Sequence, residues 1–134
     1  MARSARRGPA DEAGVATLAA VLVLPAVILL VSAVAQFVVY YHAANLATAA
    51  AQDALRAAQL ADATAEEARA RAQALLADAA PGLVLDAVVT VRRDPTAGRA
   101  RAEVHGRAPR LVPVVPLALE ATAVGPLEAF GGAG

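Results

Sequence analysis

The sequence predicts an α+β protein anchored in a membrane, with a long N-terminal helix followed by a small antiparallel β-sheet of about three strands. Three observations predict this fold class. An uncharged apolar run covers residues 15–41, an alanine-rich stretch with neither Gly nor Pro covers residues 43–80, and short alternating stretches with turn residues between them cover residues 81–125. Long stretches without Gly or Pro favour helices, whereas alternation of apolar and polar residues is typical of half-buried strands.

The apolar run from Val15 to Tyr41 contains no charged residue. A helix of about 27 residues extends about 40 Å, which is enough to cross a hydrocarbon core of about 30 Å. The alternative is a buried core helix of a soluble domain, but the rest of the chain is too small to surround such a helix. We therefore predict a transmembrane helix over residues 15–41. It should be kinked at Pro25, because proline removes one helical hydrogen bond.

Basic residues near the ends of a membrane helix set its orientation, because Lys and Arg are enriched on the cytoplasmic side. Arg3, Arg6 and Arg7 precede the run, and the next Arg along the chain is Arg56. The sequence therefore predicts a cytoplasmic leader over residues 1–14, of which residues 1–13 are polar and flexible. It also predicts a single pass through the cell membrane and an extracytoplasmic C-terminal domain, with membrane lipid as the first partner.

A cleavable secretory signal is the alternative interpretation of the same region. The small residues 33–35 suit signal peptidase, and cleavage after Ala35 would release a secreted, soluble envelope binding protein. Against cleavage, Asp11 and Glu12 directly precede the apolar run. The run is also about twice as long as the apolar core of an ordinary signal peptide.

Residues 42–80 predict an alanine-rich amphipathic helix that ends at Pro81-Gly82. The main expectation is that this helix continues the membrane helix as one rod. A break at residues 62–64, with Thr64 as the N-cap of a second helix, is the alternative. Polar residues recur at steps of three and four on one side, namely Asn45, Thr48, Gln52, Arg56, Gln59, Asp62, Glu66, Arg69 and Gln73. The opposite side carries Ala47, Ala50, Ala54, Ala57, Ala61, Ala65, Ala68, Ala72 and Leu76.

Residues 81–125 predict a small β domain, and residues 126–134 a disordered tail. A first strand over residues 83–93 should place Leu83, Leu85, Ala87, Val89 and Val91 on its inner face. After a turn at residues 94–98, the fully alternating strand 99–107 should place Ala100, Ala102, Val104 and Gly106 inward. A proline-interrupted connection then leads to a third strand over residues 116–125.

The composition argues against several classes of site. The net charge is zero, which gives no basis for nucleic-acid binding, and the absence of Cys excludes disulfides and thiolate metal sites. Candidate chemistry is limited to His42 and to an outward row of Arg101, Glu103 and His105. A lone interfacial His and a charged row on a solvated hairpin are more typical of structure than of catalysis. A membrane-anchored enzyme would need a cleft of polar residues, and the sequence shows no set of residues that would form one. We therefore predict no enzyme, no cofactor, no metal and no small-molecule substrate.

Four stretches carry a family resemblance. They are an Arg-bearing leader that ends in Gly14, GVATLAAVLVLP up to Pro25, AAAQDALRAA at residues 49–58, and HGRAPRLVPVVPLALEATAVGPLEAF from His105. Together they resemble the TadE-like pilus assembly proteins, a pseudopilin-like family of tight-adherence systems, and in particular the actinobacterial members. The resemblance implies a component of a type IV pilus or a related envelope secretion apparatus, partnered by other pseudopilins through helix contacts. It also implies cleavage between Gly14 and Val15 by a prepilin peptidase.

One position departs from the family pattern. The family's glutamate, five residues after the glycine, falls here on Ala19. In pilins this carboxylate is thought to pair with the N-terminal amine of a neighbouring subunit inside the membrane, where an unpaired charge is costly. Its replacement by Ala19 removes one means of docking into a filament, and so implies a minor or accessory component rather than the major subunit.

Overall fold

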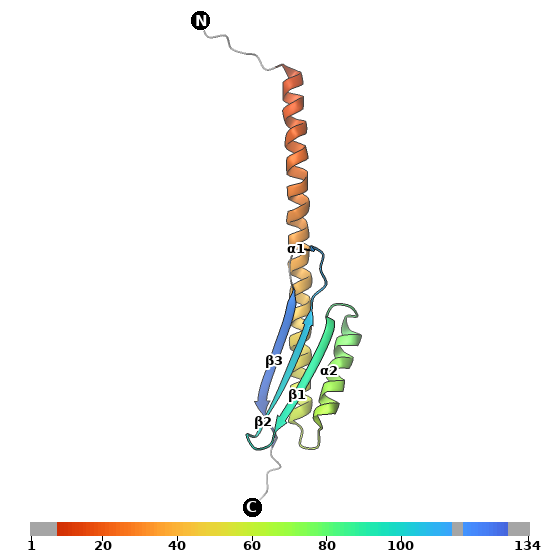
Figure 1. The fold of residues 1–134 in the computed structure, drawn as a ribbon, viewed down its shortest axis with the longest axis vertical. Helices are drawn as coiled ribbons and strands as arrows, with labels where there is room; N and C mark the ends of the chain where they lie inside the picture. The colour runs from red at the N-terminus through yellow and green to blue at the C-terminus, as the bar shows by residue number, and fades with distance from the viewer. Residues whose placement is uncertain (1–7, 114–116, 129–134) are drawn as a thin grey trace, which may run out of the picture. The chain divides into compact units, whose positions relative to one another are not determined.

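The computed structural model describes residues 8–113 and 117–128 (Figure 1). Five elements follow one another along the chain: α1 (Pro9–Gln59), α2 (Ala65–Ala79), β1 (Leu85–Asp94), β2 (Arg99–Arg107) and β3 (Ala118–Pro126). The α+β fold class predicted from the sequence is confirmed. The chain divides into two units, the first ending at Ala35 and the second beginning at Gln36.

α1 begins earlier than the sequence suggests. Pro9 occupies its first position, and Asp11 and Glu12 lie in its first turn. Proline suits a first helical position because its missing N–H has no partner there, and acidic side chains stabilise the positive end of the helix dipole. The prediction of a flexible flank is therefore wrong from Pro9 onward, whereas Arg3, Arg6 and Arg7 lie outside the described residues.

α1 ends at Gln59, so the prediction of one rod through residue 80 is wrong and the alternative break is correct. Thr64 is the N-cap of α2 and forms a capping box with Glu67. The Thr64 hydroxyl accepts from the Glu67 N–H at 3.1 Å, and the Glu67 carboxylate accepts from the Thr64 N–H at 3.0 Å. These two bonds satisfy groups that a helix start leaves unpaired.

A residue from the sheet also stabilises the turn between the two helices. The Arg93 guanidinium donates to the Ala63 carbonyl, and to the Leu60 carbonyl at 3.2 Å. Both carbonyls follow the end of α1, where backbone acceptors lack helical donors. Arg93 therefore favours the helical break from a position 30 or more residues further along the chain.

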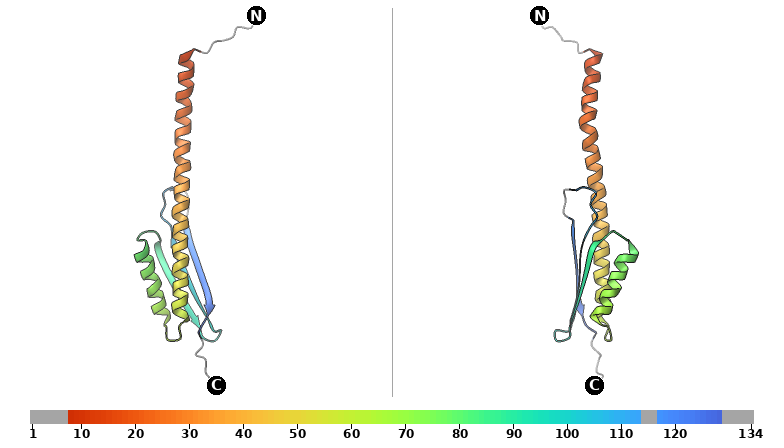
Figure 2. Two further views of the ribbon diagram at one scale, coloured as in Figure 1. Left: turned by 180° about the vertical axis from the view of Figure 1, so that it is seen from behind. Right: turned by 45° about the vertical axis from the view of Figure 1, so that its right-hand side comes forward.

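The sheet is antiparallel throughout and has the strand order β1-β2-β3. Within the second unit, α2 and the part of α1 after residue 42 lie on the same face of this sheet (Figure 2). The helices can approach the sheet closely because most of the buried side chains are alanine. Val104 is the largest side chain that is fully buried. The main cluster consists of Ala47, Ala50, Ala51, Ala54, Ala72, Leu76, Val89, Ala102, Val104 and Ala121.

A β-bulge changes the predicted inner face of β1. The pairing register shifts between Leu85 and Val88, and Asp86 has a positive φ of 50°. Val84 consequently packs against the core beside Ala87, whose inward position is as predicted, whereas Leu85 is 40% exposed, so the prediction that Leu85 faces inward is wrong. A bulge adds one residue to one strand, which breaks the two-residue alternation used to make that prediction.

The inner face of β2 is as predicted for Ala100, Ala102 and Val104, which are all buried. At the fourth position, Gly106, a Cβ atom would lie 2.6 Å from the Val84 Cγ1 and 3.1 Å from the Leu85 carbonyl oxygen. Only glycine fits this contact without a shift of the neighbouring chain, because the bulge brings backbone close to β2.

The C-terminal segment is ordered further than predicted. The third strand runs to Pro126, one residue beyond its predicted end. The Leu127 N–H donates to the Gly98 carbonyl at 2.9 Å, and the Glu128 N–H donates to the Gln59 carbonyl at 3.0 Å. The prediction of disorder is therefore wrong for residues 126–128, and the rest of the predicted tail lies outside the described residues.

Candidate functional site

Large apolar side chains are exposed around α1 in the first unit. They are Val15, Leu18, Val21, Leu22, Val23, Leu24, Val27, Ile28, Leu29, Leu30, Val31 and Val34. The most apolar 18-residue window of α1 has a mean hydropathy of 2.8, and none of this window is buried by the chain itself. A helix that is apolar on all sides needs an apolar surrounding. By length and composition, α1 can therefore cross a membrane.

The predicted cleavage point lies inside α1. Gly14 and Val15 are helical and exposed, and a Cβ atom on Gly14 would meet nothing within 4 Å. Ala19 lies one helical turn further on and is also exposed. Both residues lie within the regular helix, more than one turn after its start at Pro9, so cleavage between Gly14 and Val15 would require local unwinding and stays a prediction.

Pro25 lies within α1, and the helix continues on both sides of it. Because proline has no N–H, the Val21 carbonyl lacks its usual helical donor at this point. The kink at Pro25 remains a prediction.

Gln36 is the one buried polar side chain of the described residues, at 6% exposure. Its amide nitrogen donates to the Pro109 carbonyl at 3.0 Å. Its amide oxygen accepts from the Leu111 N–H at 2.6 Å and from the Val112 N–H at 3.2 Å. A single side chain of α1 thereby satisfies three backbone groups of the connection between β2 and β3.

Sequence reasoning missed this role of Gln36. Its only signal was a polar amide in a largely apolar run, with a proline-rich connection more than 70 residues away. The connection is closed at its base, where the Ala108 N–H donates to the Leu117 carbonyl at 2.9 Å. Ala108 and Leu117 share a small buried cluster with Ala43 and Leu119, against which Tyr40 packs.

Aromatic side chains follow Gln36 on α1. Phe37 and Tyr41 are both exposed, and their ring centroids are 6.4 Å apart in a stacked arrangement. Tyr41 also contacts the His42 ring edge-on, at 6.1 Å between centroids. Exposed tyrosine rings, which are amphipathic, are typical of the level at which a membrane helix meets the headgroups.

The connection presents basic and apolar groups together. Leu111 is 55% exposed, and Arg110 is also exposed. Leu85, Arg107, Ala108 and Arg110 line a shallow hollow of about 290 Å³. The Arg107 guanidinium also forms an ion pair with Asp86 at the bulge.

The row of Arg101, Glu103 and His105 lies on the outward side of β2. Arg101 donates to the Glu103 carboxylate, and the His105 Nε2 lies 3.8 Å from the same carboxylate. The hydrogen bond from Arg101 lowers the pKa of Glu103 below its ordinary value. A carboxylate held ionised in this way is a weak base near neutral pH, which makes the row poorly suited to acid–base catalysis. Among the residues that the structure describes, no three His, Cys, Asp or Glu side chains gather closely enough to hold a metal ion.

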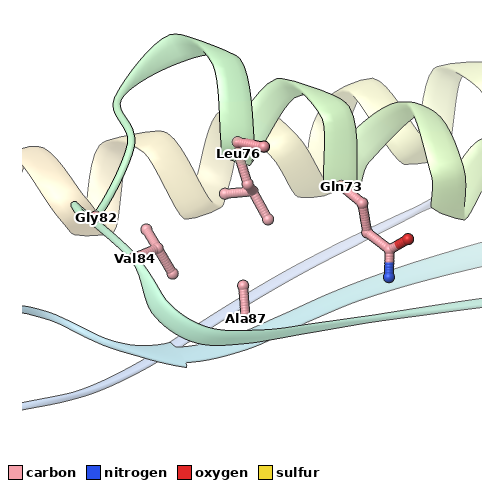
Figure 3. A pocket seen from close by; sticks show the side chains of 6 residues that line it. Gln73, Leu76, Gly82, Val84 and Ala87 are labelled. Atoms are coloured by element: carbon pink, nitrogen blue, oxygen red, sulfur yellow. The ribbon is translucent and has the colours of Figure 1, made fainter.

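A second hollow, of about 270 Å³, lies between α2 and β1 (Figure 3). Leu76 of α2 points toward Val84 and Ala87, while Gln73 and Gly82 lie at its sides. The lining carries no ionisable group, so the hollow offers neither a nucleophile nor an acid–base pair.

Comparison with known proteins adds no assignment to this geometry. No protein-family model, curated protein or solved structure matches this chain.

Proposed function

We propose that this protein is a single-pass membrane protein that acts as a minor, pseudopilin-like or accessory component in the assembly of a tight-adherence type IV pilus or a related envelope secretion apparatus. Its N-terminus would be cytoplasmic and the second unit extracytoplasmic. The observation that carries the proposal is the exposed apolar surface of α1 in the first unit, which the described residues leave uncovered.

Energetics favour lipid as the surrounding of this surface. Removing a large apolar side chain from water contributes about 1.5–3 kcal/mol when burial is complete. Summed over the twelve exposed Val, Leu and Ile side chains of residues 15–34, which are each 48–67% exposed, the gain equals or exceeds the whole stability of a small domain, about 5–15 kcal/mol. Leaving such a surface in water would promote aggregation, because soluble monomers rarely expose contiguous apolar patches of this kind.

The pilus assignment is supported by the resemblance of the leader, the apolar run and the C-terminal segment to TadE-like proteins. With Ala19 in place of the family's glutamate, the membrane helix carries no charge to pair with a neighbouring amine. Contacts with other pseudopilins would then rely on close packing of small side chains, which drives helix association in lipid. Such contacts suit an accessory subunit better than a permanent filament subunit.

Fractionation of the native host, followed by mass spectrometry of the mature N-terminus, tests this proposal. We expect the chain in the membrane fraction after alkaline carbonate extraction, with its N-terminus at Val15. An intact N-terminus would indicate a plain anchor. Deletion of the gene should reduce surface pili and re-expression should restore them, and unchanged piliation would contradict the pilus role.

A second candidate function is a secreted envelope binding protein released after Ala35. One observation favours it, because the second unit begins at Gln36, the residue that would become the new N-terminus. Against it, the released protein would expose Phe37, Val38 and Tyr41 to water. The same mass measurement distinguishes the candidates, since release gives an N-terminus at Gln36 in the soluble fraction.

A further inference from the structure

We infer that the connection between β2 and β3, through its described residues 108–113, forms a second contact with the lipid surface beside α1. Residues 108–113 form the β2–β3 loop. The inference rests on the proposed membrane segment and adds a lipid-binding surface to it. Three features of the loop support it: its depth relative to the bilayer, the hydrogen bonds of its backbone and the chemistry of its exposed side chains.

Gln36 sets the depth of the loop. It lies within the uncharged run, five residues before Tyr41, which corresponds to about 7.5 Å along a helix. The headgroup zone on each side of a bilayer is about 5–8 Å thick, and tyrosine rings favour this zone. If Tyr41 lies among the headgroups, the loop segment bonded to Gln36 lies at the boundary between headgroups and hydrocarbon.

The backbone of the loop is suited to that depth. Irregular backbone is costly near lipid unless its polar groups have partners within the protein. The Gln36 amide pairs with the Pro109 carbonyl and with the N–H groups of Leu111 and Val112. Pro109 and Pro113 have no N–H to satisfy. Gln36 thus pairs its own buried amide and three backbone groups of the loop at one point.

The exposed side chains of the loop have the chemistry of an interfacial contact. Leu111 is exposed at the level of Gln36, and Pro113 is exposed beside it. Arg110 and Arg107 line the neighbouring hollow together with Leu85, and because the Arg107 guanidinium is paired with Asp86, Arg110 is the main basic group offered to lipid. Long arginine side chains lay their apolar stems along an apolar surface and place the guanidinium among phosphates. An apolar tip with a basic rim fits a bilayer that contains anionic lipid.

Single-tryptophan variants test the inference, because the chain contains no Trp. The variant Leu111→Trp places the emitter on the loop. The matched control Val124→Trp places it at a side chain of similar exposure, 52% against 55%, on the part of β3 that pairs with Arg101. Each full chain is reconstituted in phosphatidylcholine–phosphatidylglycerol vesicles, with and without brominated acyl chains, and is checked for retention after carbonate extraction.

We expect brominated lipid to quench most of the Leu111→Trp emission and to shift it to shorter wavelength, with aqueous iodide having little effect. The Val124→Trp emission should be quenched by iodide and be insensitive to bromine. If the retained Leu111→Trp chain responds to iodide and not to brominated lipid, the inference is overturned and the membrane segment stands. Equal bromine quenching of both variants would also overturn it. A chain that leaves the vesicles on extraction would overturn the inference and the proposed membrane segment together.

Discussion

Gln36 is the single residue whose replacement should be most informative about the second unit. The substitution Gln36→Leu keeps the size of the side chain and leaves the Pro109 carbonyl and the Leu111 and Val112 N–H groups without their partner. Unsatisfied buried polar groups cost about 1–3 kcal/mol each, and partial rehydration reduces the sum. We expect the free energy of unfolding of the full chain in detergent to fall by about 1–3 kcal/mol.

Gln52→Leu is the matched control, because Gln52 lies on the exposed side of α1 in the same unit. Exposed substitutions of this kind usually change stability by less than about 0.5 kcal/mol. Circular dichroism during denaturant unfolding measures both variants. Equal losses for Gln36→Leu and Gln52→Leu would contradict the role assigned to the Gln36 amide.

Gly106 provides a second prediction at the residue scale. In Gly106→Ala the new Cβ would meet the Val84 Cγ1 at 2.6 Å and the Leu85 carbonyl at 3.1 Å. Because one of these neighbours is backbone, relief requires a shift of the bulge, and overpacking typically costs about 1–3 kcal/mol. Gly14→Ala is the control, since nothing lies within 4 Å of its Cβ position. Thermal unfolding should show a lower Tm for Gly106→Ala only, and a Tm equal to that of the unmodified chain would contradict the crowded contact.

At the scale of elements, the start of α2 depends on one cap. The substitution Thr64→Ala removes the hydroxyl that accepts from the Glu67 N–H. Loss of an N-cap typically costs about 0.5–2 kcal/mol, which lowers the Tm of a domain of this size by several degrees. Thr48→Ala is the control, because the Thr48 hydroxyl donates to the Ala44 carbonyl within α1 and caps nothing. A Tm loss no larger than that of Thr48→Ala would contradict the capping box.

The same cap predicts a pH dependence. Hydrogen bonds from the Thr64 backbone N–H and the Thr64 hydroxyl hold the pKa of Glu67 below its ordinary value of 4.5. A carboxyl with a lowered folded-state pKa stabilises the fold above its unfolded pKa, and this contribution is lost as the pH falls through the folded pKa. Glu67→Gln should therefore be less stable than the unmodified chain near neutral pH, with the difference shrinking below pH 4.5. Thermal unfolding over a pH series measures the difference, and a constant gap would contradict the linkage.

At the scale of the whole molecule, the first unit should provide membrane attachment and the second unit should fold without it. Every residue of the three buried clusters is at position 43 or later. A variant that lacks residues 1–35 should therefore keep its β-sheet signal in circular dichroism and be released by alkaline carbonate. The full chain should stay in the membrane pellet under the same conditions. Loss of the sheet signal in the shortened variant, or its retention in the pellet, would contradict this division.

The candidate site could be predicted only in part. The apolar run at residues 15–41 was evident because lipid-compatible composition is a property of consecutive residues. The lipid-facing role inferred for the β2–β3 loop could not be predicted, because Gln36 and Leu111 are 75 residues apart. Nothing in either local sequence indicates that the amide of one meets the backbone of the other.

The sequence by itself determined the apolar helix and the alternating hairpin at residues 83–107. It also determined the largely helical character of residues 43–80, because that stretch contains neither Gly nor Pro. Only the tertiary structure decided where α1 ends, because Arg93 of β1 supplies donors to carbonyls of the turn that follows α1. It also decided that Leu85 faces outward, since the bulge at Asp86 depends on pairing with β2. Periodicity and composition are local and can be derived from neighbouring residues. Which distant donor satisfies which acceptor is fixed only when the chain has packed.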